Sequence, residues 1–224
     1  MEKTLKASSQ ELLVKVRVGA VTLEGDLAVP EGSRGVVLFA HGSGSSRHSP
    51  RNRHVAQVLR GGGLATLLID LLTTDEEVVD QRTGHLRFDI NLLARRLVAA
   101  TDWLGEQSET RALRVGYFGA STGAGAALVA ATERPKVVGA IVSRGGRPDL
   151  AGAALPRVQA PTLLIVGGDD VPVIVMNREA LARLTVEAKL EIVPGATHLF
   201  EEPGTLDVVA RLAREWFQRH LVPA

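Results

Sequence analysis

Residues 115–123 read Val-Gly-Tyr-Phe-Gly-Ala-Ser-Thr-Gly, and the alanine-rich stretch Ala-Gly-Ala-Ala-Leu-Val-Ala-Ala follows at 124–131. The first run predicts a strand and the second a helix. Between them, Gly119, Ser121 and Gly123 form the pattern G-x-S-x-G. A serine at so sharp a turn is held in a strained backbone conformation, and its neighbours two positions away must be small where strand and helix crowd together. The stretch therefore predicts a strand-turn-helix unit that lifts Ser121 above a sheet. The alternative is a glycine-softened helix start with a capping serine.

Short apolar runs similar to residues 115–118 recur along the chain, separated by segments with helical spacing. Continuous apolar runs of this length are typical of strands buried on both faces of a sheet. The alternation of strand and helix calls for right-handed crossovers, so it predicts a mostly parallel sheet covered by helices on both sides. The apolar runs lie at 36–40, 64–70, 115–118, 137–142, 161–166 and 190–193, and the helical segments at 51–60, 89–105, 121–133, 177–185 and 204–221.

Two further segments, at 12–29 and 143–160, complete the expected architecture. Residues 12–18 and 21–29 alternate loosely around Gly19-Ala20, which predicts an antiparallel hairpin at one edge of a sheet of about eight strands. Residues 143–160 have room for one helix and none for a cap domain, so the site should be open to solvent. No linker-like, repetitive or low-complexity tract interrupts the sequence, and we expect one α/β domain over 1–224.

The composition is that of a globular protein and does not call for a polyanionic partner. Hydrophobic residues make up 45% of the 224-residue chain and charged residues 23%, which argues against disorder. Lysine and arginine number 26 against 25 aspartate and glutamate residues, so nothing in the net charge demands nucleic acid. Cysteine is absent, which excludes a disulfide framework, a thiolate metal site and a cysteine nucleophile.

The start of the chain and its hydropathy bear on where the protein works. Residues 1–6, Met-Glu-Lys-Thr-Leu-Lys, lack the apolar core of a signal peptide, and no window approaches eighteen consecutive apolar residues. We therefore expect a cytoplasmic protein that does not enter a membrane.

A catalytic role for Ser121 requires a base and an acid elsewhere in the chain, because a serine hydroxyl is a weak nucleophile near neutral pH. His198 lies in a loop after the last predicted strand, at the carboxyl edge where open α/β sheets form their sites. Asp169 and Asp170 follow an earlier predicted strand, and either can orient the histidine. The chain order serine, acid, histidine is associated with one α/β fold in particular. The backbone NH of Thr122, at the predicted helix N-terminus, suits an oxyanion.

Other histidines and the glycine-rich loop have less specific interpretations. His41, His48 and His54 are spaced so that they share no helical face, and a metal site is therefore not expected. Residues 42–47 follow a predicted strand and precede a predicted helix, as a dinucleotide-binding turn does. However, an arginine stands at the position of its third glycine. We expect no cofactor and no metal.

Four motifs together identify a family resemblance. The chain carries Ala-His-Gly-Ser-Gly-Ser-Ser at 40–46, Gly-Ala-Ser-Thr-Gly at 119–123, Gly-Gly-Asp-Asp at 167–170 and Gly-Ala-Thr-His at 195–198. With these motifs it resembles the α/β-hydrolases over nearly its whole length, and within them it is similar to the small dienelactone-hydrolase-like proteins. The resemblance implies that the acid ends a G-x-x-D turn, which favours Asp170 over Asp169. It also implies that the backbone NH of Ser43 is the second oxyanion donor.

The sequence departs from dienelactone hydrolases proper at the nucleophile, which is cysteine in those enzymes and Ser121 here. A serine fits an esterase, in which the hydroxyl attacks an acyl carbon and water then releases the acid. The expected function is hydrolysis of small or accessible carboxylic esters by Ser121, Asp170 and His198, with a small-molecule ester as the partner. Acyl transfer or thioester cleavage by the same residues, and a binding protein that has lost turnover, are the alternatives.

Basic residues gather in the loops expected around this site, at Arg47, His48, Arg51, Arg53, Arg144 and Arg147. If these loops converge, the mouth of the site is basic, and arginine forks can hold an anionic group of the substrate. A solvated charged rim is the alternative. Arg47 is the first candidate for an arginine that contacts substrate.

Overall fold

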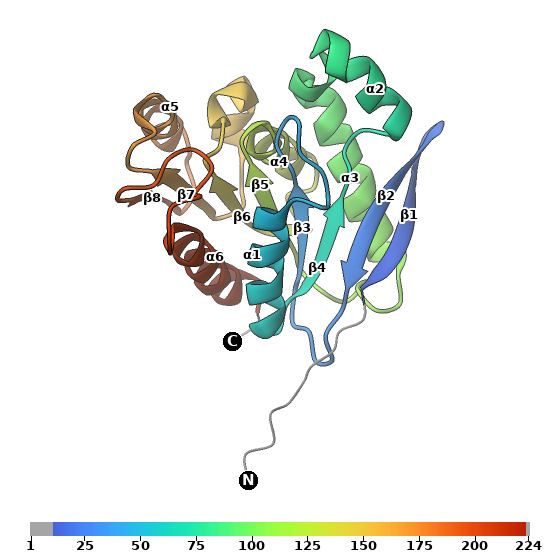
Figure 1. Cartoon of the computed structure of the whole chain (residues 1–224). Helices are drawn as coiled ribbons and strands as arrows, with labels where there is room; N and C mark the ends of the chain where they lie inside the picture. The colour runs from blue at the N-terminus through green and yellow to red at the C-terminus, as the bar shows by residue number, and fades with distance from the viewer. Residues whose placement is uncertain (1–10, 223–224) are drawn as a thin grey trace.

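β-Branched and other apolar residues build one sheet in the computed structural model, which describes residues 11–222 (Figure 1). Its strands are β1 (Leu12–Val18), β2 (Val21–Ala28), β3 (Val36–Ala40), β4 (Ala65–Ile69), β5 (Val115–Ala120), β6 (Val138–Arg144), β7 (Thr162–Gly167) and β8 (Ala188–Val193). Their order in the sheet is β1-β2-β4-β3-β5-β6-β7-β8. β1 pairs with β2 and β2 with β4 in antiparallel fashion, and the remaining pairs are parallel. The predicted mixed sheet with an N-terminal hairpin is confirmed.

Helices cover both faces of the sheet (Figure 1). They are α1 (Pro50–Gly61), α2 (Thr74–Thr83), α3 (Ile90–Glu106), α4 (Thr122–Glu133), α5 (Val171–Leu181) and α6 (Thr205–Leu221), with short 3₁₀ segments η1 (Leu86–Phe88) and η2 (Pro148–Arg157). α1 and α6 pack on one face, whereas α3, α4 and η2 pack on the other. α5 lies against β7, β8 and η2.

Alternate residues of the central strands enter two separate cores. Val36, Leu38 and Ala40 of β3 pack on the side of α3 and α4. Val37 and Phe39 pack on the side of α1 and α6. All five side chains are buried. Because both faces of β3 are covered, the strand needs no polar alternation, and this is why a continuous apolar run predicts it.

The parallel strands deliver their carboxyl ends to one edge of the sheet. β3, β5, β6, β7 and β8 run parallel, and the residues that directly follow them are His41, Ser121, Gly145, Gly168 and Pro194. Loops that leave neighbouring parallel strands meet at such an edge. The topology therefore gathers four sequence motifs that lie far apart in the chain.

Helix α5 occupies Val171–Leu181 and not the predicted segment 177–185. Pro172 stands in its first turn, where the NH that proline lacks would have no intrahelical acceptor. Asp170 is the N-cap residue of this helix. The start of a helix therefore fixes the backbone of the candidate acid, which a free loop would not do.

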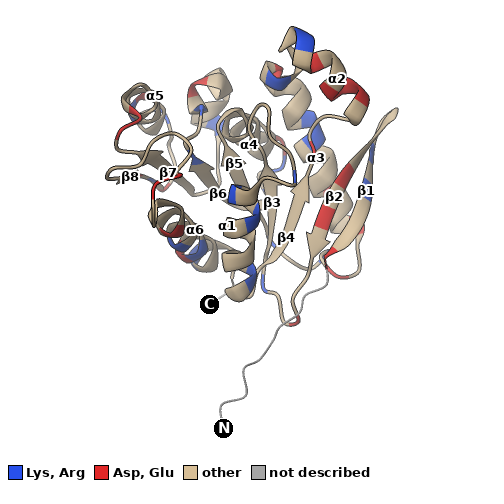
Figure 2. Cartoon of the chain, in the orientation of Figure 1, with Lys and Arg blue, Asp and Glu red and all other residues tan. Residues whose placement is uncertain are grey.

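Helix α2 is not predicted by apolar periodicity, because its only buried residue is Asp80 and acidic residues cluster along it (Figure 2). Its ends supply the stability that an apolar face supplies elsewhere. Thr73 Oγ1 accepts a hydrogen bond from the Glu76 NH at 3.3 Å, and Glu76 Oε2 accepts one from the Thr73 NH at 2.8 Å. This capping box closes the first turn. Gly84, with φ 67°, ends the helix.

An ion pair ties α2 to α3. The Arg96 side chain is 3% exposed, and its guanidinium donates to the two carboxylate oxygens of Glu76 at 2.6 and 2.5 Å. It also donates to the Leu71 carbonyl at 2.5 Å. The hydrogen bond from Arg96 is the main reason that the pKa of Glu76 is lowered. The pair anchors a helix that has little apolar contact of its own.

The connection between β6 and β7 contains η2 and no other helix or strand. It therefore carries no cap domain, as expected from its length. Gly152 interrupts the 3₁₀ geometry of η2 with a φ of 50°, so the segment is kinked and short. The carboxyl edge of the sheet stays uncovered on this side.

Between residues 11 and 222, no helix has the length and apolar character needed to cross a bilayer. Residues 1–6, which also carry the expectation of a cytoplasmic protein, lie outside the described part of the chain.

We expect Glu76→Gln to lower the free energy of unfolding at pH 7 by about 2 kcal/mol, because the variant loses a charge-assisted pair with buried Arg96. Folding lowers the pKa of Glu76. The carboxylate therefore stabilises the wild type above the pKa of the unfolded glutamate, and this stabilisation is lost as the pH falls through the folded pKa. The difference between variant and wild type should shrink in acid. Urea unfolding at pH 7 and about pH 3 measures both effects.

Glu77→Gln is the matched control on the same helix. Burial raises the pKa of Glu77, so its charged form is disfavoured in the folded protein. Neutralising this side chain should leave the unfolding free energy at pH 7 unchanged or increase it. An equal loss of stability in both variants would contradict the role given to the Arg96 pair.

Candidate active site

The turn between β5 and α4 holds Ser121 in a backbone conformation that residues other than glycine rarely adopt. Its φ is 49° and its ψ is −120°. Phe200 is the one further non-glycine residue among those described that has a positive φ. Strain of this kind persists only where the surrounding structure enforces it, and it concentrates at functional sites. The conformation is the one expected for a nucleophile at a G-x-S-x-G turn.

Two glycines make this turn possible. A Cβ on Gly119 would lie 2.4 Å from Ala124 Cα, and one on Gly123 would lie 2.2 Å from the Ala40 carbonyl oxygen. Both obstacles are backbone atoms, which cannot swing aside as a flexible side chain can. Any larger residue at either position would push α4 away from the sheet.

Backbone hydrogen bonds hold the turn from the side of β6. The Ser121 NH donates to the Arg144 carbonyl at 3.3 Å. The Ser121 carbonyl accepts from the NH groups of Ala124 and Arg147 at 3.1 and 3.0 Å. The backbone of Ser121 is thus fixed at both its donor and its acceptor, which leaves its hydroxyl as the group available for chemistry.

His198 and Asp170 meet at the same edge of the sheet. The imidazole Nδ1 donates to Asp170 Oδ2 at 2.6 Å. With its proton on Nδ1, the neutral ring carries a free lone pair on Nε2. The Asp170 side chain is 13% exposed and that of His198 is 39% exposed, so the carboxylate is shielded while the imidazole reaches solvent. Asp169 is exposed, and its backbone NH bonds to the Ala196 carbonyl at 3.0 Å. Of the two neighbouring acids, the structure places Asp170 against the histidine.

Glycines also let the histidine loop approach the sheet. A Cβ on Gly167 would lie 2.3 Å from the Ala196 carbonyl oxygen. A Cβ on Gly145, whose φ is 50°, would lie 3.5 Å from both Cε1 and Nδ1 of His198. The imidazole therefore rests on the backbone of Gly145, and this contact helps to set the orientation of its ring.

Ser121 and His198 line one cavity of about 590 Å³, which we call the serine cavity. Residues 42–46 and 48–51 supply most of the remaining lining, together with Arg144 and Leu199. The hydrogen bonds of residues 11–222 do not include one between the Ser121 hydroxyl and the His198 ring. Catalytic hydrogen bonds are often long or poorly aligned in free enzymes. The structure thus brings the two side chains to the same cavity without joining them.

His41 holds the loop that borders the serine cavity. Its Nε2 accepts a hydrogen bond from the Leu71 NH at 3.0 Å, and its Nδ1 donates to the Gly42 carbonyl at 3.0 Å. Burial lowers the pKa of His41, which favours the neutral ring that this pair of bonds requires. The ring therefore links the ends of β3 and β4 and fixes the start of the loop at 42–46.

The two residues predicted to hold the oxyanion lie next to each other. The Ser43 NH donates a hydrogen bond of 3.0 Å to the side-chain oxygen Oγ1 of Thr122. Thr122 is 2% exposed and is the first residue of α4. This bond joins the loop after β3 to the turn after β5. The sequence carries no signal for it, because any residue at that position satisfies the G-x-S-x-G pattern.

A second cavity, of about 240 Å³, adjoins the first and is called the inner cavity below. Residues 42–46 line both cavities. Thr122, Leu93 and Glu77 also line the inner cavity. The loop at 42–46 therefore lies between the serine cavity and the inner cavity. The inner cavity cannot be predicted from the sequence, because residues of α2 line it and α2 has no apolar periodicity that would predict it.

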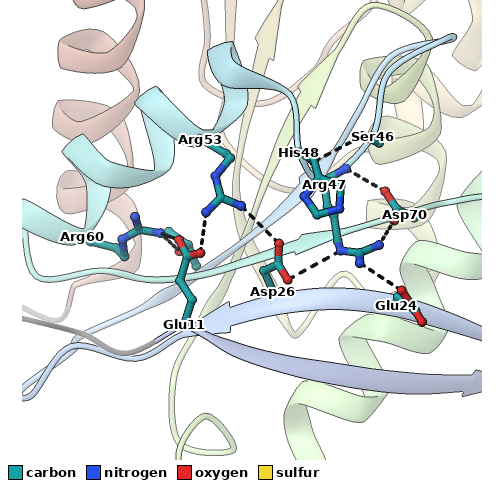
Figure 3. A network of polar contacts seen from close by, with 10 residues as sticks. Glu11, Glu24, Asp26, Ser46, Arg47, His48, Arg53, Arg60 and Asp70 are labelled. Carbon is teal, nitrogen blue, oxygen red and sulfur yellow. Dashed lines mark hydrogen bonds and ion pairs between the residues drawn. The ribbon is translucent and has the colours of Figure 1, made fainter.

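Arg47 is engaged in an ion-pair network on the β2 side and not at the serine cavity (Figure 3). Its guanidinium contacts Asp70 and lies 2.9 Å from a Glu24 oxygen and 3.5 Å from an Asp26 oxygen. Its backbone NH donates to Asp70 Oδ1 at 2.7 Å. Because three carboxylates already surround this cation, the structure gives it a structural role in place of the expected contact with substrate.

Arg144 is the buried arginine at the serine cavity. Its Nη1 donates to the Leu199 carbonyl at 3.4 Å, its Cζ lies 6.0 Å from the centre of the Phe200 ring, and its Nε has no partner. No ion pair among residues 11–222 includes it. Burial lowers the pKa of Arg144 to about 10, so the guanidinium is still charged at pH 7. Arg51, which lines the same cavity, pairs with Glu201 at 2.9 Å.

The three histidines considered for a metal have separate surroundings. His41 spans two strand ends, His48 lines the serine cavity, and His54 Nε2 lies 2.8 Å from Asp207 Oδ1. In the part of the chain that the structure describes, no three histidine, aspartate or glutamate side chains are grouped to hold a metal ion.

The fold agrees with comparisons to known proteins. The model of the family described as "Dienelactone hydrolase family" matches residues 23–221. The chain belongs to the dienelactone hydrolase family. A dienelactone hydrolase from Anabaena variabilis, known from a crystal structure, is 66% identical with a TM-score of 0.93, covering 95% of this chain and 98% of that chain.

More distant members of the fold extend the comparison with this dienelactone hydrolase family protein. Est1E from Butyrivibrio proteoclasticus, solved with ferulic acid bound, is 15% identical with a TM-score of 0.76, covering 92% of this chain and 98% of that chain. At such low identity the likeness supports the fold alone.

Curated relatives of this dienelactone hydrolase family protein are longer than the chain. A Mycobacterium tuberculosis protein named "Putative phosphoribosyl transferase" is 61% identical over 208 residues, which are 93% of this chain and 46% of that protein. The chain thus spans about half the length of these curated relatives.

We expect Gly123→Ala to lower the free energy of unfolding by about 1–3 kcal/mol, because the new methyl group meets the Ala40 carbonyl. Gly105→Ala in α3 is the control, since a Cβ there meets no atom within 4 Å. In an exposed helix this change should stabilise the protein by about 0.5–1 kcal/mol. Urea unfolding measures both. Equal stability of wild type and Gly123→Ala would show that the turn is not closed as described.

Proposed function

We propose that this dienelactone hydrolase family protein is a serine hydrolase that cleaves carboxylic esters through an acyl-enzyme. Ser121 is the nucleophile, His198 is the general base, and Asp170 orients His198. One observation carries the proposal: the strained Ser121 and the imidazole bonded to Asp170 reach the same cavity from separate strand ends. A serine that only caps a helix needs neither a strained backbone nor a histidine–aspartate pair at the same cavity.

In the first step, Ser121 Oγ adds to the acyl carbon while His198 Nε2 takes the proton of the hydroxyl. The bond from Nδ1 to Asp170 stabilises the imidazolium that forms. The Thr122 NH, at the N-terminus of α4, donates to the carbonyl oxygen as it becomes negative. His198 then gives the proton to the departing alkoxide, and the acyl group stays on Ser121.

In the second step, a water molecule takes the place of the alcohol. His198 Nε2 removes a proton from this water as its oxygen adds to the acyl carbon, and the second tetrahedral adduct forms at the same oxyanion position. Collapse of the adduct breaks the bond to Ser121 Oγ, which regains a proton from His198. The products are a carboxylic acid and an alcohol, and the enzyme returns to its starting state.

The open edge of the sheet bears on which esters fit. The β6–β7 connection carries only η2, so no cap covers the serine cavity from that side. Sites that bury long acyl chains need such a cover to exclude water. The substrates are therefore small or accessible esters. The name phosphoribosyl transferase belongs to a relative with about twice this length, and the groups at the serine cavity are those of acyl chemistry.

The triad is tested by activity and by covalent labelling. We expect Ser121→Ala to abolish aryl ester hydrolysis and labelling by a fluorophosphonate probe, read as a mass shift of the intact protein. Asp170→Asn should lower kcat by about 10⁴-fold, because the imidazole loses the acceptor that sets its tautomer.

Asp169→Asn is the matched control, since its side chain is exposed next to the same turn. It should keep kcat near the wild-type value. Labelling of both wild type and Ser121→Ala, or of neither, would overturn the assignment of the nucleophile. Equal losses in the two aspartate variants would overturn the assignment of the acid.

The substrate class that fits the serine cavity carries an anionic group. Arg144 is a desolvated cation whose Nε has no partner, and such a charge is costly unless it is paired. A carboxylate or phosphate of the substrate supplies the missing counter-charge, and a guanidinium can hold such a group with two hydrogen bonds. Arg51, which lines the same cavity, is already paired with Glu201, so Arg144 is the arginine left to bind such a group.

We expect Arg144→Met to lower kcat/KM for an aryl ester with a free carboxylate on its acyl chain by about 10–100-fold, the value of a charge-assisted hydrogen bond. The methyl-capped neutral ester should be little affected. Salt should weaken the preference of the wild type. Arg147→Met is the control, because Arg147 pairs with Asp149 at 2.7 Å. Equal wild-type rates for the acidic and neutral esters would contradict the role of Arg144.

A further inference from the structure

The hydrogen bond between Ser43 and Thr122 changes how the oxyanion position is built. Two backbone NH groups, those of Ser43 and Thr122, are expected to point at it. The Ser43 NH, however, already donates to Thr122 Oγ1 at 3.0 Å. An NH group has one proton to give. The Thr122 hydroxyl therefore accepts the hydrogen bond that the resemblance assigns from the Ser43 NH to the oxyanion.

The surroundings keep this hydroxyl in place. Thr122 is 2% exposed in the first turn of α4, and the Gly123 contact presses that turn against β3. On the other side, His41 fixes the loop of Ser43. A Cβ on Gly42 would lie 3.1 Å from Ser121 Cβ, so the loop already lies close to the nucleophile. Separating the two groups would require the loop or the helix to move.

The proton of the Thr122 hydroxyl is free to donate. Threonine within a helix usually gives this proton to a carbonyl three or four residues earlier. For Thr122 those positions belong to strand β5 and not to a helical turn. No hydrogen bond among residues 11–222 has this hydroxyl as donor. Thr122 lines the inner cavity and not the serine cavity, which its chain neighbour Ser121 lines, so the open space beside the hydroxyl lies at the loop of residues 42–46 that borders both cavities.

A hydroxyl that accepts one hydrogen bond becomes a better donor of the next, because chains of hydrogen bonds polarise one another. The Ser43 NH draws electron density from Thr122 Oγ1, and this strengthens the OH dipole toward a negative oxygen. The arrangement is a relay in which the Ser43 NH acts on the oxyanion through the hydroxyl of Thr122.

We propose that Thr122 is a catalytic residue that donates twice to the oxyanion, from its backbone NH and from its side-chain hydroxyl. Ser43 is a positioning residue whose NH holds and polarises that hydroxyl. This inference rests on the proposed serine hydrolase function, since the oxyanion forms when Ser121 Oγ adds to the acyl carbon. No proton leaves Thr122 during the reaction, because His198 takes the proton of the nucleophile.

The test compares side chains of similar shape at one position. Thr122→Val keeps the branching and removes the hydroxyl, and it should lower kcat for aryl ester hydrolysis by about 10²–10³-fold with little change in KM, as loss of an oxyanion donor does. Thr122→Ser keeps the hydroxyl and should retain most of the activity. Thr122→Ala also removes the hydroxyl, and its kcat should match that of Thr122→Val. The alanine variant preserves the test if the valine variant does not fold.

A transition-state analogue separates donation from a structural role. An aryl trifluoromethyl ketone forms a tetrahedral adduct with the serine, so its affinity should fall in Thr122→Val by the same factor as kcat/KM. If Thr122 only stabilised the loop, Thr122→Val would lower the melting temperature, and inhibitor affinity would not fall in proportion to kcat/KM. Unchanged or higher kcat in Thr122→Val would mean that the freed Ser43 NH is the true donor, and it would overturn the proposal. An equal loss in Thr122→Ser would do the same.

The failure of the underlying function is distinguishable from the failure of this inference. Wild-type protein that neither hydrolyses aryl esters nor takes the fluorophosphonate label at Ser121 would overturn both. Active wild-type protein with a fully active Thr122→Val variant would overturn only the role of Thr122.

Discussion

The approach of α4 to the sheet at Gly119 and Gly123 is the constraint on which the rest of the site depends. With backbone atoms of Ala124 and Ala40 this close to the glycines, the chain can leave β5 and enter the helix only by a sharp turn. The turn forces Ser121 into its strained conformation and points the first NH groups of α4 toward the edge. It also sets Thr122 against the Ser43 loop. Packing of backbone on backbone thus produces the geometry that the proposed acyl chemistry requires.

The fold is predictable to the extent that burial leaves a pattern in the sequence. Strand β3 is buried on both faces and its apolar run marks it, while the alternation at 12–18 marks the hairpin. α2 leaves no such pattern, because a capping box and the Arg96 ion pair stabilise it in place of an apolar face. α5 begins earlier than its apolar spacing suggests, because Pro172 starts the helix directly after Asp170.

The site is predictable where one motif carries both the residue and its backbone conformation, as for Ser121. It is less so where long-range contacts decide a side chain's role. Arg47 and Arg144 both lie in loops or strand ends near the site, and only the folded chain shows that carboxylates surround the first while the second has no ion-pair partner among residues 11–222. The bond from Ser43 to Thr122 spans two loops and has no local signature. Charge pairing across the fold is set by packing, and sequence spacing does not reveal it.

The loop at 42–46 borders the serine cavity on one side and the inner cavity on the other. Any displacement of this loop widens one compartment and narrows its neighbour. The dimensions of the two compartments are therefore coupled. Under the proposed function, a change in loop sequence that admits a bulkier acyl group alters the space beside α2 as well. Selection for a new ester would then act on both compartments together, through one short segment that lies outside the hydrogen-bonded sheet.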